Sequence, residues 1–166
     1  MKDLVIQEVI EQKIYLIRGQ KVMLDRDLAL LYEITTGNFN KAVSRNLERF
    51  PSDFMFTLNK EEFRNLIFQF GTSKWGGTRK NPRVFTEHGI LMLSSVLNSK
   101  RATQVNIQIM RTFIKLRKLL ETHKELLKKI EEMEKRYDKQ FRIVFQVIRG
   151  LGESPKETKS KIGFHP

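Results

Sequence analysis

The feature that most constrains this chain is a long stretch in its second half without helix-breaking residues. No glycine or proline occurs between Gly89 and Gly150. Positions spaced alternately four and three residues apart within it are apolar at ten of twelve sites, which is the pattern of a coiled coil. The twelve are Ile109, Phe113, Leu116, Leu120, His123, Leu127, Ile130, Glu134, Tyr137, Phe141, Val144 and Ile148. The pattern predicts one helix from about Ser99, roughly 50 residues and about 75 Å long.

Alone in water such a helix would leave its apolar stripe wet, so a second copy of the chain is its simplest partner. The predicted dimer seam comprises Phe113, Leu116, Leu120, Leu127, Ile130, Tyr137, Phe141, Val144 and Ile148. His123 and Glu134 weaken this seam but can fix its register, and we interpret His123 as a spectator rather than a pH sensor or ligand. Residues 121–149 are thus predicted to be a coiled-coil extension of the last helix, with a disordered tail over 150–166.

The charge balance points to an anionic partner. The 31 basic and 19 acidic side chains give a net charge of +12 and a sequence pI of about 10.0, as in many nucleic-acid-binding domains. Residues 71–83 carry four cations and no acid, and no acidic residue occurs from His88 to Leu120. Runs of one sign attract polyanions, although they can also be solvated faces that only keep a protein soluble.

The composition also excludes several kinds of site and classes of protein. The chain has no cysteine, which excludes disulfides, thiolate zinc sites and a cysteine nucleophile. No apolar run approaches the length of a membrane span, and the N-terminus lacks the apolar core of a secretory signal. We therefore expect a cytoplasmic protein without a membrane partner, associated with the nucleoid if the source is bacterial.

The next segment predicts a β-hairpin and a helix. Residues 14–17 and 22–24 have the character of strands, and Gly19 between them suits a hairpin turn. Asp25 is the expected N-cap of a helix of two to three turns. Residues 35–37 then break the helical period.

A second helix is predicted from Asn38 to Phe50, ended by Pro51. Its apolar face comprises Phe39, Val43, Leu47 and Phe50. The candidate DNA contacts on the opposite face are Asn38, Lys41, Ser44, Arg45 and Arg49. Two short helices joined by a tight turn are typical of a helix-turn-helix, whose second helix enters the major groove, although the same pattern also occurs in packing hairpins. Arg45 and Arg49 are the strongest candidates, because a guanidinium can donate two parallel hydrogen bonds.

Residues 53–58 and 83–85 are predicted strands, with a capping box at Asn59–Glu62 opening a helix between them. The loop 71–83 is interpreted as the tip of a basic wing that lies along a phosphate backbone, the alternative being a simple surface loop. Its candidate contacts are Lys74, Trp75, Arg79, Lys80 and Arg83. Thr86 is expected to cap a buried helix that follows.

The stretches RNLERFPSDFMFTLNKEEF and GTSKWGGTRKNPRVFTEHGILMLSSVLNSKRATQVNIQIMRTFIKLR resemble a known family. The chain is similar, over about residues 12–118, to the KilA-N-type DNA-binding domain of phage antirepressor-like proteins, in the subgroup named for the N-terminal domain of the phage ORF-six product. This resemblance implies a regulatory DNA-binding protein of phage, prophage or bacterial origin. The chain departs from the pattern at Gly37 and Ser44, where relatives are often basic.

Catalytic patterns are missing from the sequence. It has no phosphate-binding loop and no H-E-x-x-H motif, and its three histidines are far apart. We therefore predict no enzyme activity, metal, cofactor or small-molecule ligand. The predicted fold is α+β: a winged helix-turn-helix-like domain with small β-hairpins over 1–120, followed by the long C-terminal coiled-coil helix. The predicted function is double-stranded DNA binding as a homodimer. The alternative is a coiled-coil adaptor whose basic face binds an acidic protein or RNA.

Overall fold

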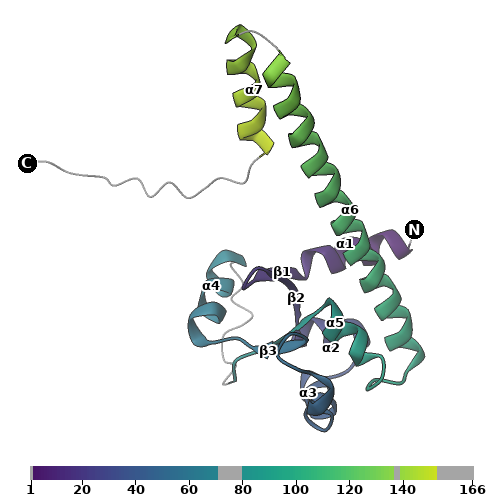
Figure 1. The fold of residues 1–166 in the computed structure, drawn as a ribbon. Coiled ribbons are helices and arrows are strands. Elements are labelled where there is room, and N and C mark those ends of the chain that lie inside the picture. Colours follow the sequence, from purple (N-terminus) through teal and green to yellow (C-terminus); the bar gives the residue numbers. More distant parts are fainter. Residues whose placement is uncertain (1, 71–79, 137–138, 153–166) are drawn as a thin grey trace, which may run out of the picture. The chain divides into compact units, whose positions relative to one another are not determined.

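The computed structural model describes residues 2–70, 80–136 and 139–152. The chain forms two compact units, Met1–Ile114 and Lys115–Pro166. The elements are α1 (Lys2–Gln12), β1 (Ile14–Ile17), β2 (Gln20–Leu24), α2 (Asp25–Tyr32), α3 (Thr36–Ser44), the short 3-10 turn η1 (Leu47–Arg49), β3 (Met55–Thr57), α4 (Lys60–Phe70), β4 (Arg83–Thr86), α5 (Glu87–Leu93), α6 (Lys100–Arg136) and α7 (Lys139–Gly152). The predicted α+β class is confirmed (Figure 1).

The first unit is built on a four-stranded antiparallel sheet in the order β1-β2-β4-β3. β1 and β2 pair through Ile17 and Gln20, which leaves a two-residue turn. Arg18 and Gly19 in this turn have φ angles of 53° and 72°. Positive φ at both positions matches the twist of a two-residue hairpin, so the predicted turn at Gly19 is confirmed.

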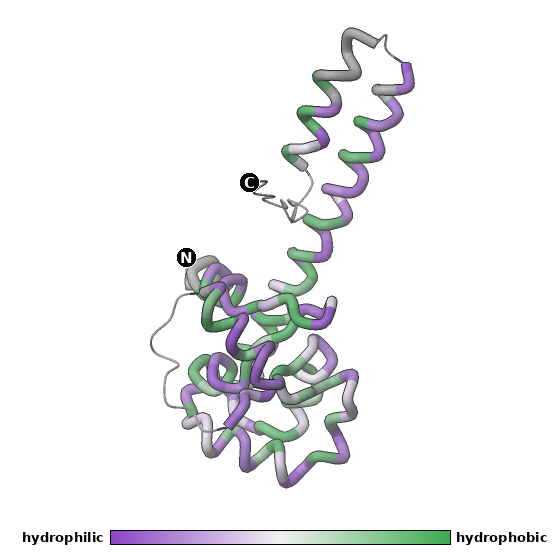
Figure 2. Tube along the Cα trace, turned by 90° about the vertical axis from the view of Figure 1, so that its left-hand side faces the viewer, coloured by the Kyte–Doolittle hydropathy of each residue, from purple (hydrophilic) through white to green (hydrophobic). Residues whose placement is uncertain are grey.

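Successive residues of the central strands point to opposite faces of the sheet, as the period of two requires. Met23 and Phe85 enter the larger of two apolar clusters, whereas Val22, Leu24 and Val84 enter the smaller one. The larger cluster is formed with α1, α2, α3, α5 and the first part of α6, and the smaller one with α4. The sheet is therefore covered on both faces. Figure 2 shows hydrophobic stretches (green) alternating with hydrophilic ones (purple) along the chain.

Phe85 packs against two other aromatic rings in the larger cluster. Its ring packs edge-on against Phe39 at 5.4 Å and against Phe50 at 5.8 Å between ring centroids. Phe39, Val43 and Phe50 are buried, as the apolar face of the second predicted helix requires. Leu47, assigned to the same face, is instead 49% exposed because it lies on η1 rather than on α3.

The start of α5 shows a cap and a close approach. Thr86 is the N-cap, as predicted: its hydroxyl accepts from the Gly89 amide and lies 3.0 Å from the Asp53 carbonyl. A Cβ on Gly89 would lie 2.1 Å from the carbonyl oxygen of Phe54. Glycine is therefore required here by backbone packing, not by its φ angle.

The predicted capping box at the start of α4 is also confirmed. The Asn59 side chain accepts from the Glu62 amide at 2.8 Å and donates to the Glu62 carboxylate at 3.1 Å. Arg18 donates to both oxygens of the same carboxylate, at 2.9 Å and 3.3 Å. The β1-β2 turn and α4 are thereby joined beside the smaller apolar cluster. β3 and β4 pair with each other, and α4 lies in the connection between them, where the capping box predicted a helix.

The first part of α6 belongs to the core of the first unit. Ala102, Val105, Ile109 and Phe113 are all buried in the larger cluster. Phe113 is 3% exposed, so assigning it to a dimer seam was wrong: the core of its own chain covers it. The Tyr32 hydroxyl donates to the buried Asn106 side chain and joins α2 to α6.

The second unit is a helical hairpin. α6 and α7 run antiparallel beside each other, so the predicted continuous helix of roughly 50 residues is wrong. His123 Nε2 lies 2.6 Å from the Gly152 carbonyl oxygen, which brings the end of α7 back beside α6 (Figure 1). α7 also extends to Gly152, past the predicted start of the tail at 150, and residues 153–166 lie outside the described residues.

Candidate nucleic-acid interface

α2 and α3 form the predicted pair of short helices joined by a tight turn. α2 ends at Tyr32, and its C-cap residue Glu33 has a left-handed φ of 59°. The Thr35 hydroxyl caps α3 by accepting from the Asn38 amide at 3.1 Å. Asp25 is the first residue of α2 and does not cap it, contrary to the prediction. Its carboxylate is used in tertiary contacts instead.

α3 covers Thr36–Ser44 and not the predicted 38–50. The change comes from Asn46, whose side-chain amide donates to the Ala42 carbonyl at 2.9 Å while its backbone amide donates to Val43. This side chain takes the position of a helical backbone bond, as asparagine often does at helix ends. The chain then forms η1, which places Arg49 on a separate turn.

A groove of about 860 Å³ runs along one face of α3. Its residues come from the start of α2, from α3, and from the segment that leads into β4. They are Asp25, Arg26, Thr36, Gly37, Asn40, Lys41, Ser44, Arg45, Lys80, Asn81, Pro82 and Arg83. The second helix of the pair and the end of the basic loop therefore share one surface.

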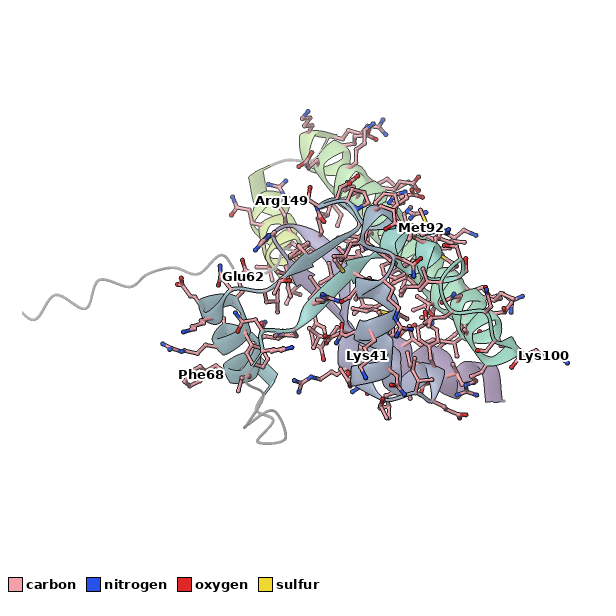
Figure 3. All side chains as sticks on the ribbon, turned by 90° about the horizontal axis from the view of Figure 1, so that it is seen from below. Lys41, Glu62, Phe68, Met92, Lys100 and Arg149 are labelled. Atoms are coloured by element: carbon pink, nitrogen blue, oxygen red, sulfur yellow. The ribbon has the colours of Figure 1, made fainter. Side chains whose placement is uncertain are left out.

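The lining of this groove is strongly cationic. Among the described residues that line it, five side chains are basic and only Asp25 is acidic. Lys41, Arg45 and Lys80 are exposed and have no ion-pair partner within the described ranges. In Figure 3, Lys41 is seen on α3, on the face of the domain turned toward the viewer. Several cations along a concave surface raise the local potential and attract an anionic polymer.

The floor of the groove is a buried polar network around Asp25, which is 5% exposed. One carboxylate oxygen accepts from the Arg26 amide at 2.7 Å. The other accepts from the Asn40 side chain at 2.9 Å and from the Arg83 amide at 3.3 Å. The carboxylate of Asp25 is thus already hydrogen-bonded within the protein.

The structure brings together five of the ten predicted DNA-contact residues. They are Lys41, Ser44, Arg45, Lys80 and Arg83. Asn38 is exposed on α3 but outside the groove, and Arg49 lies on η1. Lys74, Trp75 and Arg79 lie outside the described residues.

Among the groove residues that sequence reasoning missed, Asp25 and Asn40 form its hydrogen-bonded floor. Asp25 has the spacing of an ordinary N-cap, and Asn40 is one polar residue among several on its helix. Their roles depend on β4, which is more than 40 residues away in the sequence. No pattern within a short stretch of sequence predicts this contact with β4.

The predicted seam residues of the second unit divide by exposure. Leu116, Leu127 and Ile130 are half-buried, whereas Leu120, Val144 and Ile148 are 50%, 53% and 41% exposed. Tyr137 and the side chain of Phe141 lie outside what the structure describes. An apolar stripe therefore stays open on the hairpin.

The perturbed acid groups lie in the core, away from the groove. Burial is the main cause that raises the pKa of Asp27, against the opposing effect of Lys13, whose ammonium lies 3.5 Å away. Burial also raises the pKa of Tyr15 to about 12, and burial raises the pKa of Tyr32 as well. None of these three groups lines the groove.

Two further searches concern other kinds of site. Among the described residues, no three histidine, aspartate or glutamate side chains gather in a way that could hold a metal ion. Within the same residues, no helix has both the length and the apolar character of a membrane span.

Comparison with protein families matches residues 12–96 to the ORF6N domain. The matched range contains β1 to β4, the α2-α3 pair and every residue that lines the groove. Comparison with curated proteins and with solved structures found no match. Because the matched residues make up more than half of the 166-residue chain, this protein belongs to the phage-associated ORF6N domain family.

Proposed function

We propose that this protein binds double-stranded DNA and acts as a phage or prophage regulator of the antirepressor type. α2 and α3 act as a helix-turn-helix, with α3 in the major groove and residues 80–83 beside the neighbouring backbone. The observation that carries the proposal is the convergence of Lys41, Arg45 and Lys80 on one groove.

The physical argument is one of charge and shape. Cations from two separated segments face the same hollow surface, and the only acid in it is buried and hydrogen-bonded. DNA offers regularly spaced phosphates, whose neutralisation releases counterions and supplies most of the non-specific affinity. A recognition helix lined by an adjacent basic segment contacts both base edges and backbone. The resemblance to KilA-N-type domains supports the same role, which is binding and not catalysis.

The second unit supplies a homodimer interface in this proposal. Val144, Val147, Ile148 and Leu151 of α7 recur at helical spacing and are 41–84% exposed. Leu119, Leu126 and Met133 recur every seven residues on α6 and are 43–57% exposed. Two hairpins can bury these stripes against one another as a four-helix assembly. A dimer would present two recognition helices to a two-fold-related operator.

The test is fluorescence anisotropy with a labelled duplex at about 50 mM salt, where phosphate contacts are strong. The full chain should bind, and Arg45→Glu should weaken binding at least about tenfold, because each lost charged contact contributes on the order of 1–3 kcal/mol. Lys60→Glu is the matched control, since Lys60 is an exposed cation on α4 outside the groove.

No binding by the wild type, or equal losses in both variants, would contradict the proposal. If an acidic protein instead competed with DNA for the wild type and not for Arg45→Glu, the adaptor alternative would gain support. To separate duplex DNA from RNA, the affinity for each should be measured over the same salt series.

A further inference from the structure

The hydrogen-bond network under the groove indicates that some groove residues hold α3 in place, whereas others are free to contact the ligand. We infer that Arg83 is a positioning residue: its contacts with Ser44, Asn40 and Asp25 set the distance between α3 and the 80–83 segment. This inference rests on the proposed function and deepens it. It moves Arg83 and Ser44 from the group of predicted DNA contacts to the group that shapes the site.

The Arg83 guanidinium is already directed at α3. Nη1 donates to the Asn40 backbone carbonyl at 3.2 Å and lies 3.4 Å from the Asn40 side-chain oxygen. Nη2 donates to the Ser44 hydroxyl at 3.0 Å. A planar guanidinium can span these two helical turns, whereas an ammonium is a single point.

The backbone of the same residue is fixed from the opposite direction. The Arg83 amide donates to the Asp25 carboxylate, which also accepts from the Asn40 side chain. One buried carboxylate thus joins the start of α2, the middle of α3 and the start of β4. Because Asp25 is almost fully buried, loss of any of these donors leaves it incompletely satisfied, which is costly in a low dielectric.

The segment that carries Lys80 is held against the sheet as well. Pro82 is buried, and its carbonyl accepts from the Leu58 amide at 3.0 Å. Lys80 is only two residues from this anchor. The cations on the two walls of the groove are therefore arranged before any ligand arrives, which lowers the entropy lost on binding.

Ser44→Ala and Arg83→Lys test the inference, because neither changes the charge of the protein. Each should weaken duplex binding by about tenfold while the slope of log affinity against log salt stays as in the wild type. The double variant should bind no more weakly than either single one, since both remove the same linkage. Arg45→Gln should instead reduce the slope by about 0.9, as expected for a lost phosphate contact.

A second measurement follows hydrogen exchange of the α3 amides in the free protein. Exchange should be faster in Ser44→Ala and in Arg83→Lys than in the wild type, and unchanged in Ser52→Ala, an exposed serine outside the groove. Thermal unfolding of all variants shows whether the domain as a whole stays folded.

The inference is overturned if Ser44→Ala binds like the wild type, if the two losses add in the double variant, or if α3 exchange is unchanged. If the wild type itself binds no duplex, the proposed function fails, and the exchange of α3 alone decides the inference. The two failures are thus distinguishable.

Discussion

Gly89 packs so closely against the backbone that its replacement by alanine tests this packing. An alanine Cβ would lie 2.1 Å from the Phe54 carbonyl oxygen, and backbone cannot move aside as a flexible side chain can. Gly89→Ala should therefore lower the free energy of unfolding by about 3 kcal/mol or more, at the upper end for overpacking. Urea denaturation measures the change.

The matched control is Gly37→Ala. Gly37 lies in α3, and a Cβ there meets nothing within 4 Å. Alanine at this position should leave stability unchanged or raise it by up to about 1 kcal/mol, because glycine is unfavourable in helices. Equal destabilisation at both positions would contradict the close approach at Gly89.

Asp27 predicts a pH dependence of stability. Burial raises its pKa in the folded state above the ordinary value of 3.8, despite Lys13. The folded protein therefore binds the proton more tightly than the unfolded chain, and stability falls as pH rises through the folded pKa. The stability of the wild type minus that of Asp27→Asn should decrease from about pH 4 toward neutrality. A difference that rises with pH would contradict the sign.

Residue roles were predictable where they depend on near neighbours. Thr86 and Asn59 are caps because the partner amide lies three residues away, a spacing visible in the sequence. Asp25 and Gly89 were not predictable in the same way. Their decisive neighbours, Arg83 and Phe54, are far from them along the chain.

Element types followed from hydrophobic periodicity, and element ends did not. The strands of the first hairpin and the α2-α3 pair were expected, since apolar spacing of two or near four residues fixes them. α3 ends early because the Asn46 side chain competes with the helix. The long heptad pattern did not predict that α7 runs back along α6, because an antiparallel hairpin and a continuous coiled coil share the same spacing.

The open stripe on α7 predicts self-association. Val147 is 60% exposed, so Val147→Glu should leave the hairpin folded but place a charge in the proposed dimer interface. Dimer affinity should fall at least about tenfold, because burying an unpaired carboxylate is unfavourable. Sedimentation equilibrium measures the change.

Gln146→Glu is the control for this prediction, because it adds the same charge to an adjacent exposed position of α7 off the apolar stripe. It should sediment like the wild type. A monomeric wild type, or equal loss of dimer in both variants, would contradict the interface.

At the scale of the whole molecule, the sequence predicted the fold class, and five of its ten candidate DNA-contact residues line the groove. A charge run indicated the basic segment before β4, and helical periodicity indicated the basic face of α3. Only the tertiary structure brings these two segments together as walls of one groove. The pattern could not show that Arg49 would leave the helix, since that depends on where α3 ends. Lys74, Trp75 and Arg79 stay predictions, because the structure does not describe them.

The most direct test of the central claim is the salt dependence of duplex binding by the wild type and by a variant with Lys41, Arg45 and Lys80 changed to glutamine. If the three cations face one phosphate-bearing ligand, the slope of log affinity against log salt should decrease by about 2.7, or about 0.9 for each contact. Unchanged slopes in the two proteins would show that these groups do not meet the backbone together and would contradict the account.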